Sequence, residues 1–250
     1  MKKFELTAEF VTNVFGKKLF RIKALVAFGN VEKGELGGFV EKENNLSQDG
    51  NAWVTGNACV TDNARVTGNA WVTDNARVTD NARVTGNAWV TGNARVTGNA
   101  WVTDNARVTD NARVTGIAWV TGNACVTGNA WVTGNAWVTG NACVTDNACV
   151  TDNACVTGNA RVTGIAWVTG NADYSVVEGF GRYFRATTFF RCKDKILRVQ
   201  CGCFYGDLAQ FREIVKKTHG DSKYAKEYLA IADLMELHFS DEKENQEVSE

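Results

Sequence analysis

The chain has 250 residues and a formal net charge of −1, with 27 Lys and Arg against 28 Asp and Glu. Seven Arg balance seven Asp within residues 51–170, so that stretch lacks the basic field that binding to nucleic acid needs. No apolar run approaches the roughly 18 residues that cross a bilayer, which excludes membrane insertion.

Changes in pattern divide the chain into four regions. Residues 1–50 are a mixed N-terminal cap, and residues 51–170 are an uninterrupted array of repeats. Residues 171–239 are a compact C-terminal module, and residues 240–250 are an acidic tail that we expect to be disordered. The eight Cys lack the spacings of a disulfide framework, and the N-terminal residues lack an apolar signal segment. We therefore expect a reduced, cytoplasmic protein.

The N-terminal cap contains two short segments that look like irregular first hexads of the array, Gly38–Val40 and Asn44–Leu46. An open coil of repeats is an exposed strand edge, so such arrays need caps at both ends. We predict an apolar plug over the first coil, made by Phe4, Phe10, Val14, Phe15, Phe20, Ile22 and Leu25.

The array repeats the hexad Asn-Ala-x-Val-Thr-Gly/Asp twenty times, where x is Trp, Arg or Cys, and only Ile117 and Ile165 replace the Asn. Ala and Val stand two apart and point to one side of an extended strand, while x and Thr point to the other. Gly or Asp followed by Asn tolerates positive φ and makes a tight corner. One strand and one corner per hexad predict a triangular coil that closes after three hexads.

This pattern resembles that of hexapeptide-repeat proteins, in which a small residue stands two places before an aliphatic one, as Ala52 before Val54 and Ala166 before Val168. The resemblance covers about half the chain and implies a left-handed parallel β-helix. The predicted fold class is therefore mainly β, a hexapeptide-repeat solenoid with a small α+β C-terminal cap. At about 4.8 Å per coil, six to seven coils make a rod of roughly 30 Å, with ladders of Asn, Thr and Val along its axis.

Two flanking segments carry a second resemblance. The segment from Arg21 to Gly50 is similar to the sequence that precedes the repeats in hexapeptide-repeat proteins of bacteria, prophages and phages. It reads RIKALVAFGNVEKGELGGFVEKENNLSQDG. A module at the ends of phage-encoded repeat proteins resembles TTFFRCKDKILRVQCGCFYGDLAQF and, further on, THGDSKYAKEY. These proteins generally have no assigned function. The resemblance implies a protein of phage or prophage origin, either in the cytoplasm of a bacterial host or associated with a virion.

Residues eighteen apart stack on one face, so the outward x positions form columns along the axis. Exposed Trp and Arg ladders can bind another protein, a second copy of the chain, sugars or bases. The alternative is that these side chains only pack on their neighbours and stabilise the sheet. The candidate recognition surface consists of Trp53, Trp71 and Trp89, of Arg77, Arg95 and Arg113, and of Trp101, Trp119 and Trp137.

Hexapeptide-repeat folds include many acyltransferases, which generally use a His as general base. The array has no His, and the two in the chain, His219 and His238, lie in the C-terminal module. We therefore predict a non-enzymatic structural or binding protein with no catalytic residue, cofactor or metal, and with protein or self-association as its partner. An acyltransferase-like enzyme is the alternative.

In the C-terminal module, Arg185–Arg191 and Ile196–Gln200 predict a hairpin that turns at Lys193–Lys195. Asp207 is a predicted N-cap of a helix that runs to His219, and a second helix follows from about Ser222 to His238. The expected unit is therefore ββαα. The apolar residues at helical spacing are Phe211, Ile214, Val215, Tyr224, Tyr228, Leu229, Ala232 and Met235.

The same module offers two weaker candidate sites. A nucleic-acid patch, the second alternative function, would use the basic residues of the hairpin, which only Asp194 opposes: Arg182, Arg185, Arg191, Lys193, Lys195 and Arg198. A zinc site would use Cys192, Cys201, Cys203 and His219. Because Cys-x-Cys on a strand lacks the knuckle of C-x-x-C, we expect buried apolar cysteines instead of a metal site.

Overall fold

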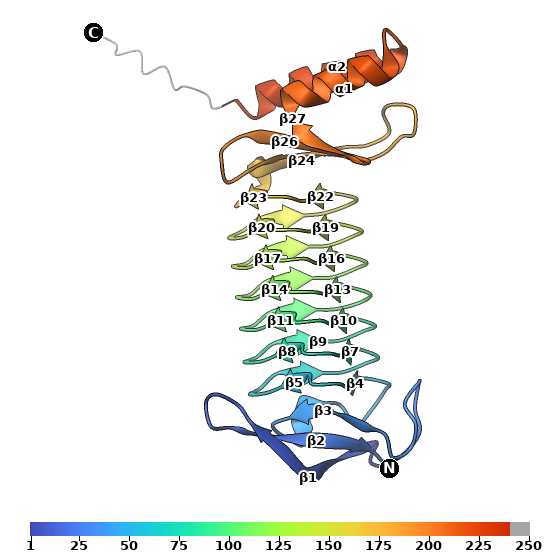
Figure 1. Cartoon of the computed structure of the whole chain (residues 1–250), viewed down its shortest axis with the longest axis vertical. Helices are drawn as coiled ribbons and strands as arrows, with labels where there is room; N and C mark the ends of the chain where they lie inside the picture. Colours follow the sequence, from blue (N-terminus) through green and yellow to red (C-terminus); the bar gives the residue numbers. More distant parts are fainter. Residues whose placement is uncertain (241–250) are drawn as a thin grey trace, which may run out of the picture. The chain divides into compact units, whose positions relative to one another are not determined.

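The computed structural model describes residues 1–240, so the predicted tail beyond Ser240 lies outside the described residues. The chain forms two compact units, Met1–Asn171 and Ala172–Glu250. The first is a parallel β-solenoid that follows an antiparallel hairpin, and the second is an antiparallel sheet with two helices (Figure 1). The predicted fold class, a mainly β parallel solenoid of hexapeptide repeats with a small α+β unit, is confirmed.

Every hexad of the array forms one strand of two residues, the outward residue and the Val that follows it. Each strand pairs in parallel with the strand eighteen residues away, so the strands build three faces that run along the axis of the solenoid (Figure 1). The first face is a 7-stranded sheet of β4 (Trp53–Val54), β7 (Trp71–Val72), β10 (Trp89–Val90), β13 (Arg107–Val108), β16 (Cys125–Val126), β19 (Cys143–Val144) and β22 (Arg161–Val162).

The other two faces have the same construction. The second face holds β5 (Cys59–Val60), β8 (Arg77–Val78), β11 (Arg95–Val96), β14 (Arg113–Val114), β17 (Trp131–Val132), β20 (Cys149–Val150) and β23 (Trp167–Val168). The third face is a 6-stranded sheet of β6 (Arg65–Val66), β9 (Arg83–Val84), β12 (Trp101–Val102), β15 (Trp119–Val120), β18 (Trp137–Val138) and β21 (Cys155–Val156).

The interior of the solenoid consists of the Ala and Val of every hexad, all of which are at most 1% exposed. At the corners, the sixth residue of every hexad except the last has a positive φ, as predicted: it is 59° at Asp104 and 74° at Gly116. A Cβ on Gly116 would lie 2.9 Å from the backbone nitrogen of Gly134 in the next coil, which shows how closely the corners stack. The predicted Asn ladders are confirmed, since the Asn81 amide donates to the Asn99 carbonyl oxygen at 3.1 Å.

The N-terminal residues close the open edge of the second face with antiparallel strands. β1 (Phe4–Thr12) pairs with β2 (Lys18–Ala24), which pairs with β3 (Leu36–Val40). β3 in turn runs parallel to β5, with Phe39 beside Cys59 and Val40 beside Val60. Residues 38–40 therefore form the irregular hexad that the sequence predicts.

Different residues close the other two edges. On the first face, the Lys3 ammonium donates to the Ala52 carbonyl at 2.9 Å. On the third face, the short 3-10 helix η1 (Glu43–Asn45) places the Asn45 amide 2.9 Å from the Ala64 carbonyl, and Leu46 bridges to Val66. The predicted irregular hexad at residues 44–46 is thereby confirmed.

The predicted apolar plug is only partly correct. Phe4 and Ile22 are fully buried, whereas Phe10, Val14 and Phe15 are exposed, at 45%, 88% and 84%. The reason is that the end of the β1–β2 hairpin lies beside the second face of the solenoid instead of across the coil. Phe20 and Leu25 are half-buried.

The second unit is a four-stranded antiparallel sheet with two helices. The predicted hairpin is confirmed as β25 (Thr187–Arg191) and β26 (Leu197–Cys201), and the predicted helices as α1 (Leu208–His219) and α2 (Lys223–His238). Asp207 caps α1 by accepting a hydrogen bond from the Gln210 backbone at 2.8 Å. The sequence missed the outer strands β24 (Tyr174–Val177) and β27 (Phe204–Asp207), and the short 3-10 helix η2 (Asn171–Asp173) precedes β24.

The core of the second unit lies between the sheet and the helices, and it includes Phe189 and Val199 from the strands. Five of the eight predicted helical core residues are buried, namely Phe211, Val215, Tyr228, Ala232 and Met235. Ile214 and Tyr224 are instead exposed, at 37% and 36%, and Leu229 packs partly buried against the core.

Candidate functional site

The outward columns exist as the sequence predicts, and the third face holds the longest aromatic ladder. Trp101, Trp119 and Trp137 occupy equivalent positions in three successive coils. The centroids of the first two rings are 4.8 Å apart with planes at 1°, and those of the last two are 5.3 Å apart with planes at 13°. The Arg83 guanidinium lies 4.7 Å from the Trp101 ring centroid. One guanidinium and three indoles therefore form a continuous stack.

The stacking decides which part of each indole a partner can reach. The flat faces of Trp101 and Trp119 are turned toward each other or toward Arg83, so these faces are already covered. Trp137 is nevertheless 47% exposed. A sugar or a base that binds by stacking needs the free face of a ring. At Trp101 and Trp119 the ladder instead presents ring edges, which suits contact with another extended surface.

Few side chains project from the corners beside this ladder, because glycine is the sixth residue at most of them. Gly98, Gly116 and Gly134 lie between the second and third faces, where other coils have Asp. The one large side chain at this corner is Ile117, which is 53% exposed. Ile117 adds an exposed apolar group beside the indoles, since it lies two residues before Trp119. We call Trp101, Ile117, Trp119 and Trp137 the aromatic patch.

The predicted ladder on the first face differs from the expectation at its first member. Trp71 and Trp89 are stacked, with ring centroids 6.0 Å apart. Trp53 continues the column in register but is fully buried, because the rings of Phe4 and Phe28 pack against it at 6.5 and 5.3 Å. Trp53 therefore belongs to the N-terminal cap, and its place in the recognition surface is corrected.

The arginine ladder of the second face is in register, and its charges are not neutralised by the aspartates of the array. Arg77, Arg95 and Arg113 pair in successive strands. Within residues 1–240, no ion pair joins any of the three to a carboxylate, and Arg113 packs on the Trp131 ring at 4.8 Å. The corner carboxylates are turned to the backbone instead: Asp80 accepts a hydrogen bond from the Gly98 nitrogen at 3.0 Å.

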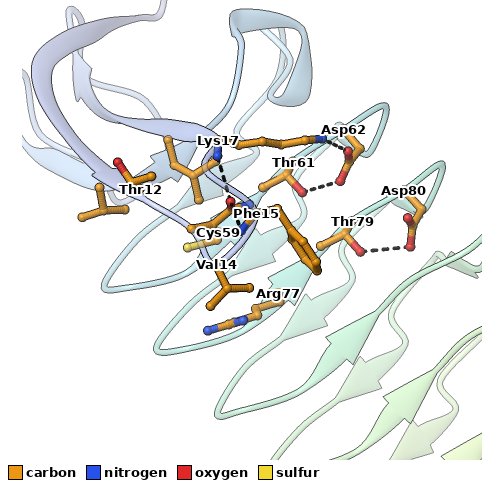
Figure 2. Close-up of a pocket in the computed structure, with 13 residues that line it drawn as sticks. Thr12, Val14, Phe15, Lys17, Cys59, Thr61, Asp62, Arg77, Thr79 and Asp80 are labelled. Carbon is orange, nitrogen blue, oxygen red and sulfur yellow. Dashed lines mark hydrogen bonds and ion pairs between the residues drawn. The ribbon is translucent and has the colours of Figure 1, made fainter.

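The β1–β2 hairpin and the second face enclose a pocket of about 770 Å³ (Figure 2). Val14 and Phe15 come from the turn of the hairpin, and Cys59 and Arg77 come from β5 and β8. Figure 2 shows the hairpin end reaching over the strands of the second face, with Lys17 directed to the Asp62 carboxylate. The sequence analysis missed this pocket, although two adjacent apolar residues in a hairpin turn were a signal for it.

An ion-pair cluster fastens the hairpin at this place. The Lys17 ammonium pairs with the Asp62 carboxylate and lies 3.7 Å from Glu41 Oε2. Asp62 also accepts a hydrogen bond from the Thr61 hydroxyl at 2.7 Å. Hydrogen bonds from Lys17 and Thr61 lower the pKa of Asp62, and the hydrogen bond to Asp62 raises the pKa of Lys17. Both groups therefore stay charged at neutral pH.

The basic C-terminal patch has less available charge than the sequence suggests. Arg198 makes two hydrogen bonds to the Asp194 carboxylate, at 2.7 and 2.6 Å, which lower the pKa of Asp194 to about 2. Arg191 pairs with Asp173 at 3.6 Å and donates to the Phe239 carbonyl at 3.0 Å. Asp194 is thus not the only carboxylate that opposes the patch, since Asp173 also does so.

The remaining members of the patch are scattered. The guanidinium groups of Arg182 and Arg185 lie 5.6 and 4.9 Å from the Tyr183 ring centroid. Lys193 and Lys195 belong to the turn between β25 and β26, where Lys195 has a φ of 63°. The geometry therefore gives the nucleic-acid alternative less support than the residue count gave it.

The candidate metal ligands of the second unit do not converge. Among residues 1–240, no group of three or more His, Cys, Asp and Glu is positioned to hold a metal ion. Cys192 is buried, and burial raises the pKa of its thiol. Cys201 accepts a hydrogen bond from the Thr187 hydroxyl at 3.2 Å, while Cys203 is exposed. His219 lies 5.8 Å from the Tyr228 ring, between centroids.

Comparisons of the sequence with protein families and with curated proteins gave no match. None of the helices in residues 1–240 is long and apolar enough to cross a membrane.

Proposed function

We propose that the chain is a non-enzymatic binding scaffold that associates laterally with a second copy of itself through the aromatic patch of the third face. The observation that supports this most directly is the parallel stack of Trp101, Trp119 and Trp137, whose edges stay accessible between glycine corners. Trp and Arg are the residues that contribute most to binding at protein interfaces.

The arrangement of the patch favours a second copy over an unrelated partner. The three indoles are evenly spaced, one coil apart, with Trp119 in the middle. A twofold axis through the middle indole would set Trp101 of one copy against Trp137 of the other. Twofold symmetric dimers are the commonest homo-oligomers, and in them the same surface patch of both copies forms the contact.

The setting of this scaffold is part of the same proposal. The segments on both sides of the array resemble those of phage and prophage repeat proteins, and this resemblance is the support for a phage or prophage origin. The scaffold would then act in the cytoplasm of a bacterial host or as part of a virion. An acyltransferase-like activity has less support, because the array contributes no His to any face.

The test compares two substitutions that the array itself already uses at equivalent positions. Trp119→Arg replaces the half-buried middle indole of the patch, and Trp131→Arg replaces an indole on the second face that is 45% exposed, more than Trp119. Because Arg occupies this position in seven other hexads, both variants are expected to fold. Sedimentation velocity should show a dimer for the unchanged chain and for Trp131→Arg, and a monomer for Trp119→Arg. A monomeric unchanged chain, or equal effects of both substitutions, would refute the proposal.

A further inference from the structure

Within residues 1–240, the pocket beside the hairpin has one charged group that no ion pair neutralises. Lys17, Asp62 and Glu41 satisfy one another at the rim. The Asp80 carboxylate, also in the lining, is used by the Thr79 hydroxyl at 3.1 Å and the Gly98 nitrogen at 3.0 Å. Arg77 remains: among residues 1–240 no carboxylate forms an ion pair with its guanidinium.

The neighbours of Arg77 in its column make this charge available to a ligand. The next position toward the N-terminus holds the thiol of Cys59, and the next position toward the C-terminus holds a second cation, Arg95. Burial raises the pKa of Cys59, although the Arg77 charge opposes that shift, so the thiol stays neutral at pH 7 and supplies no counter-charge. An anion in the pocket would meet the Arg77 guanidinium, and the neighbouring column positions, Cys59 and Arg95, supply no carboxylate.

The opposite wall of the pocket is largely apolar. Val11, Val14, Phe15 and Leu19 of the hairpin supply its apolar groups, and Thr12, Asn13 and Lys17 complete the lining on this side. Val14 and Phe15 are the most exposed apolar side chains of the solenoid unit after Met1, at 88% and 84%. Apolar side chains held this far into solvent cost free energy unless something covers them. The ion pairs of Lys17 with Asp62 and Glu41 join the hairpin to the solenoid next to these side chains.

From the unpaired Arg77, the apolar wall and the size of the pocket, we propose that this site binds a small amphipathic carboxylic acid. The carboxylate would accept hydrogen bonds from the Arg77 guanidinium, which binds such groups with two parallel N–H donors. The hydrocarbon part would cover Val14 and Phe15. A volume of about 770 Å³ lies in the range of small-molecule sites, which is about 300 to 1,000 Å³. The site is separate from the aromatic patch, which lies on the third face.

Isothermal titration of the full chain with decanoate tests this site. Decanoate should bind saturably with one site per chain, and Arg77→Gln should weaken the binding at least tenfold. The matched control is Arg95→Gln, which removes the same charge one coil further along, outside the lining, and should change the affinity less than threefold. Decanol, which has the same chain and no charge, should bind at least tenfold more weakly than decanoate.

A second variant tests the apolar wall without touching the array. Phe15→Ser lies in the exposed turn of the hairpin, so it should leave the thermal melt unchanged and weaken decanoate binding severalfold. The absence of saturable binding would overturn the proposal. Equal losses in Arg77→Gln and Arg95→Gln would also overturn it, because they would indicate general attraction to the arginine column. Neither result depends on whether the chain forms dimers.

Discussion

The array and the N-terminal cap belong to the same unit, but they are stabilised in different ways. In the array every coil repeats the same buried Ala and Val and the same backbone hydrogen bonds, so no single residue is unique. In the cap, each of three strand edges is closed by a different group, among them Lys3, Asn45 and strand β3. We therefore expect that each residue of the array contributes a small and similar share of the stability, whereas single residues of the N-terminal cap contribute a large share.

The largest expected effect comes from tryptophan, which occurs both in the N-terminal cap and on the surface of the array. Trp53 is fully buried in the cap, whereas Trp137 is 47% exposed on the third face. Trp53→Ala should lower the free energy of unfolding by about 3–5 kcal/mol, because it leaves a large cavity between Phe4, Phe28 and the first coil. Trp137→Ala should cost about 1 kcal/mol. Urea unfolding followed by circular dichroism measures both.

A conservative variant separates packing from hydrogen bonding at this position. The indole nitrogen of Trp53 is buried, and it has no hydrogen-bond partner in the part of the chain that the structure describes. Trp53→Phe removes that orphan donor and keeps an aromatic ring, so it should lose much less stability than Trp53→Ala. If Trp53→Ala and Trp137→Ala cost the same, stability is not concentrated in the cap.

The second prediction concerns the corners of the array. Gly116 has a φ of 74°, and a Cβ there would lie 2.8 Å from the Gly134 carbonyl oxygen. Gly116→Ala should therefore lower stability by about 1–3 kcal/mol. Gly116→Asp should cost less although it is larger, because its carboxylate can accept the hydrogen bond from the Gly134 nitrogen, as Asp80 does from Gly98. Thermal melts of the two variants would contradict this if alanine were the milder change.

The third prediction uses acid to weaken the array. Asp110 accepts hydrogen bonds from the Thr127 hydroxyl and the Gly128 nitrogen, and these lower its pKa below the ordinary value of 3.8. The pKa of Asp104 is lowered in the same way, by Thr121 and Gly122. A carboxylate whose pKa is lower in the folded state stabilises the fold above its unfolded pKa. That contribution is lost as the pH falls through the folded pKa.

The melting temperature should thus decrease between pH 5 and pH 2, and Asp110→Asn should make this decrease smaller. Asn tolerates the positive φ of this corner, so the fold is retained. The prediction fails if the variant and the unchanged chain lose the same number of degrees over this range.

The sequence predicted most of the solenoid because one hexad specifies one strand and one corner. The pairing of Trp101 with Trp119 follows from the period, and the positive φ of Asp104 follows from the Asp-Asn pair at the corner. The cap was harder, since the burial of Trp53 depends on Phe28, twenty-five residues away, and no repeat indicates that contact. The pocket was missed because it depends on the direction that a hairpin takes, and neither the pairing of β2 with β3 nor the ion pair of Lys17 with Asp62 is indicated by a repeat.

The smallest expected effect tests whether an exposed apolar residue of the array lowers its folding stability and favours dimerisation. Ile117 interrupts the ladder in which Asn81 donates to Asn99, and neither Asn99 nor Asn135 pairs across it. Ile117→Asn would restore two exposed hydrogen bonds and should gain up to about 1 kcal/mol. Since Ile117 belongs to the aromatic patch, the same change should weaken dimerisation.

Ile165→Asn is the matched control, because Ile165 interrupts an Asn ladder at the corner between the first and second faces. It should gain one hydrogen bond, from Asn147, and leave the sedimentation of the dimer unchanged. A variant at Ile117 that is more stable and still fully dimeric would show that Ile117 lies outside the contact. A more stable variant that dissociates would show instead that Ile117 lowers the folding stability of the array and stabilises the dimer.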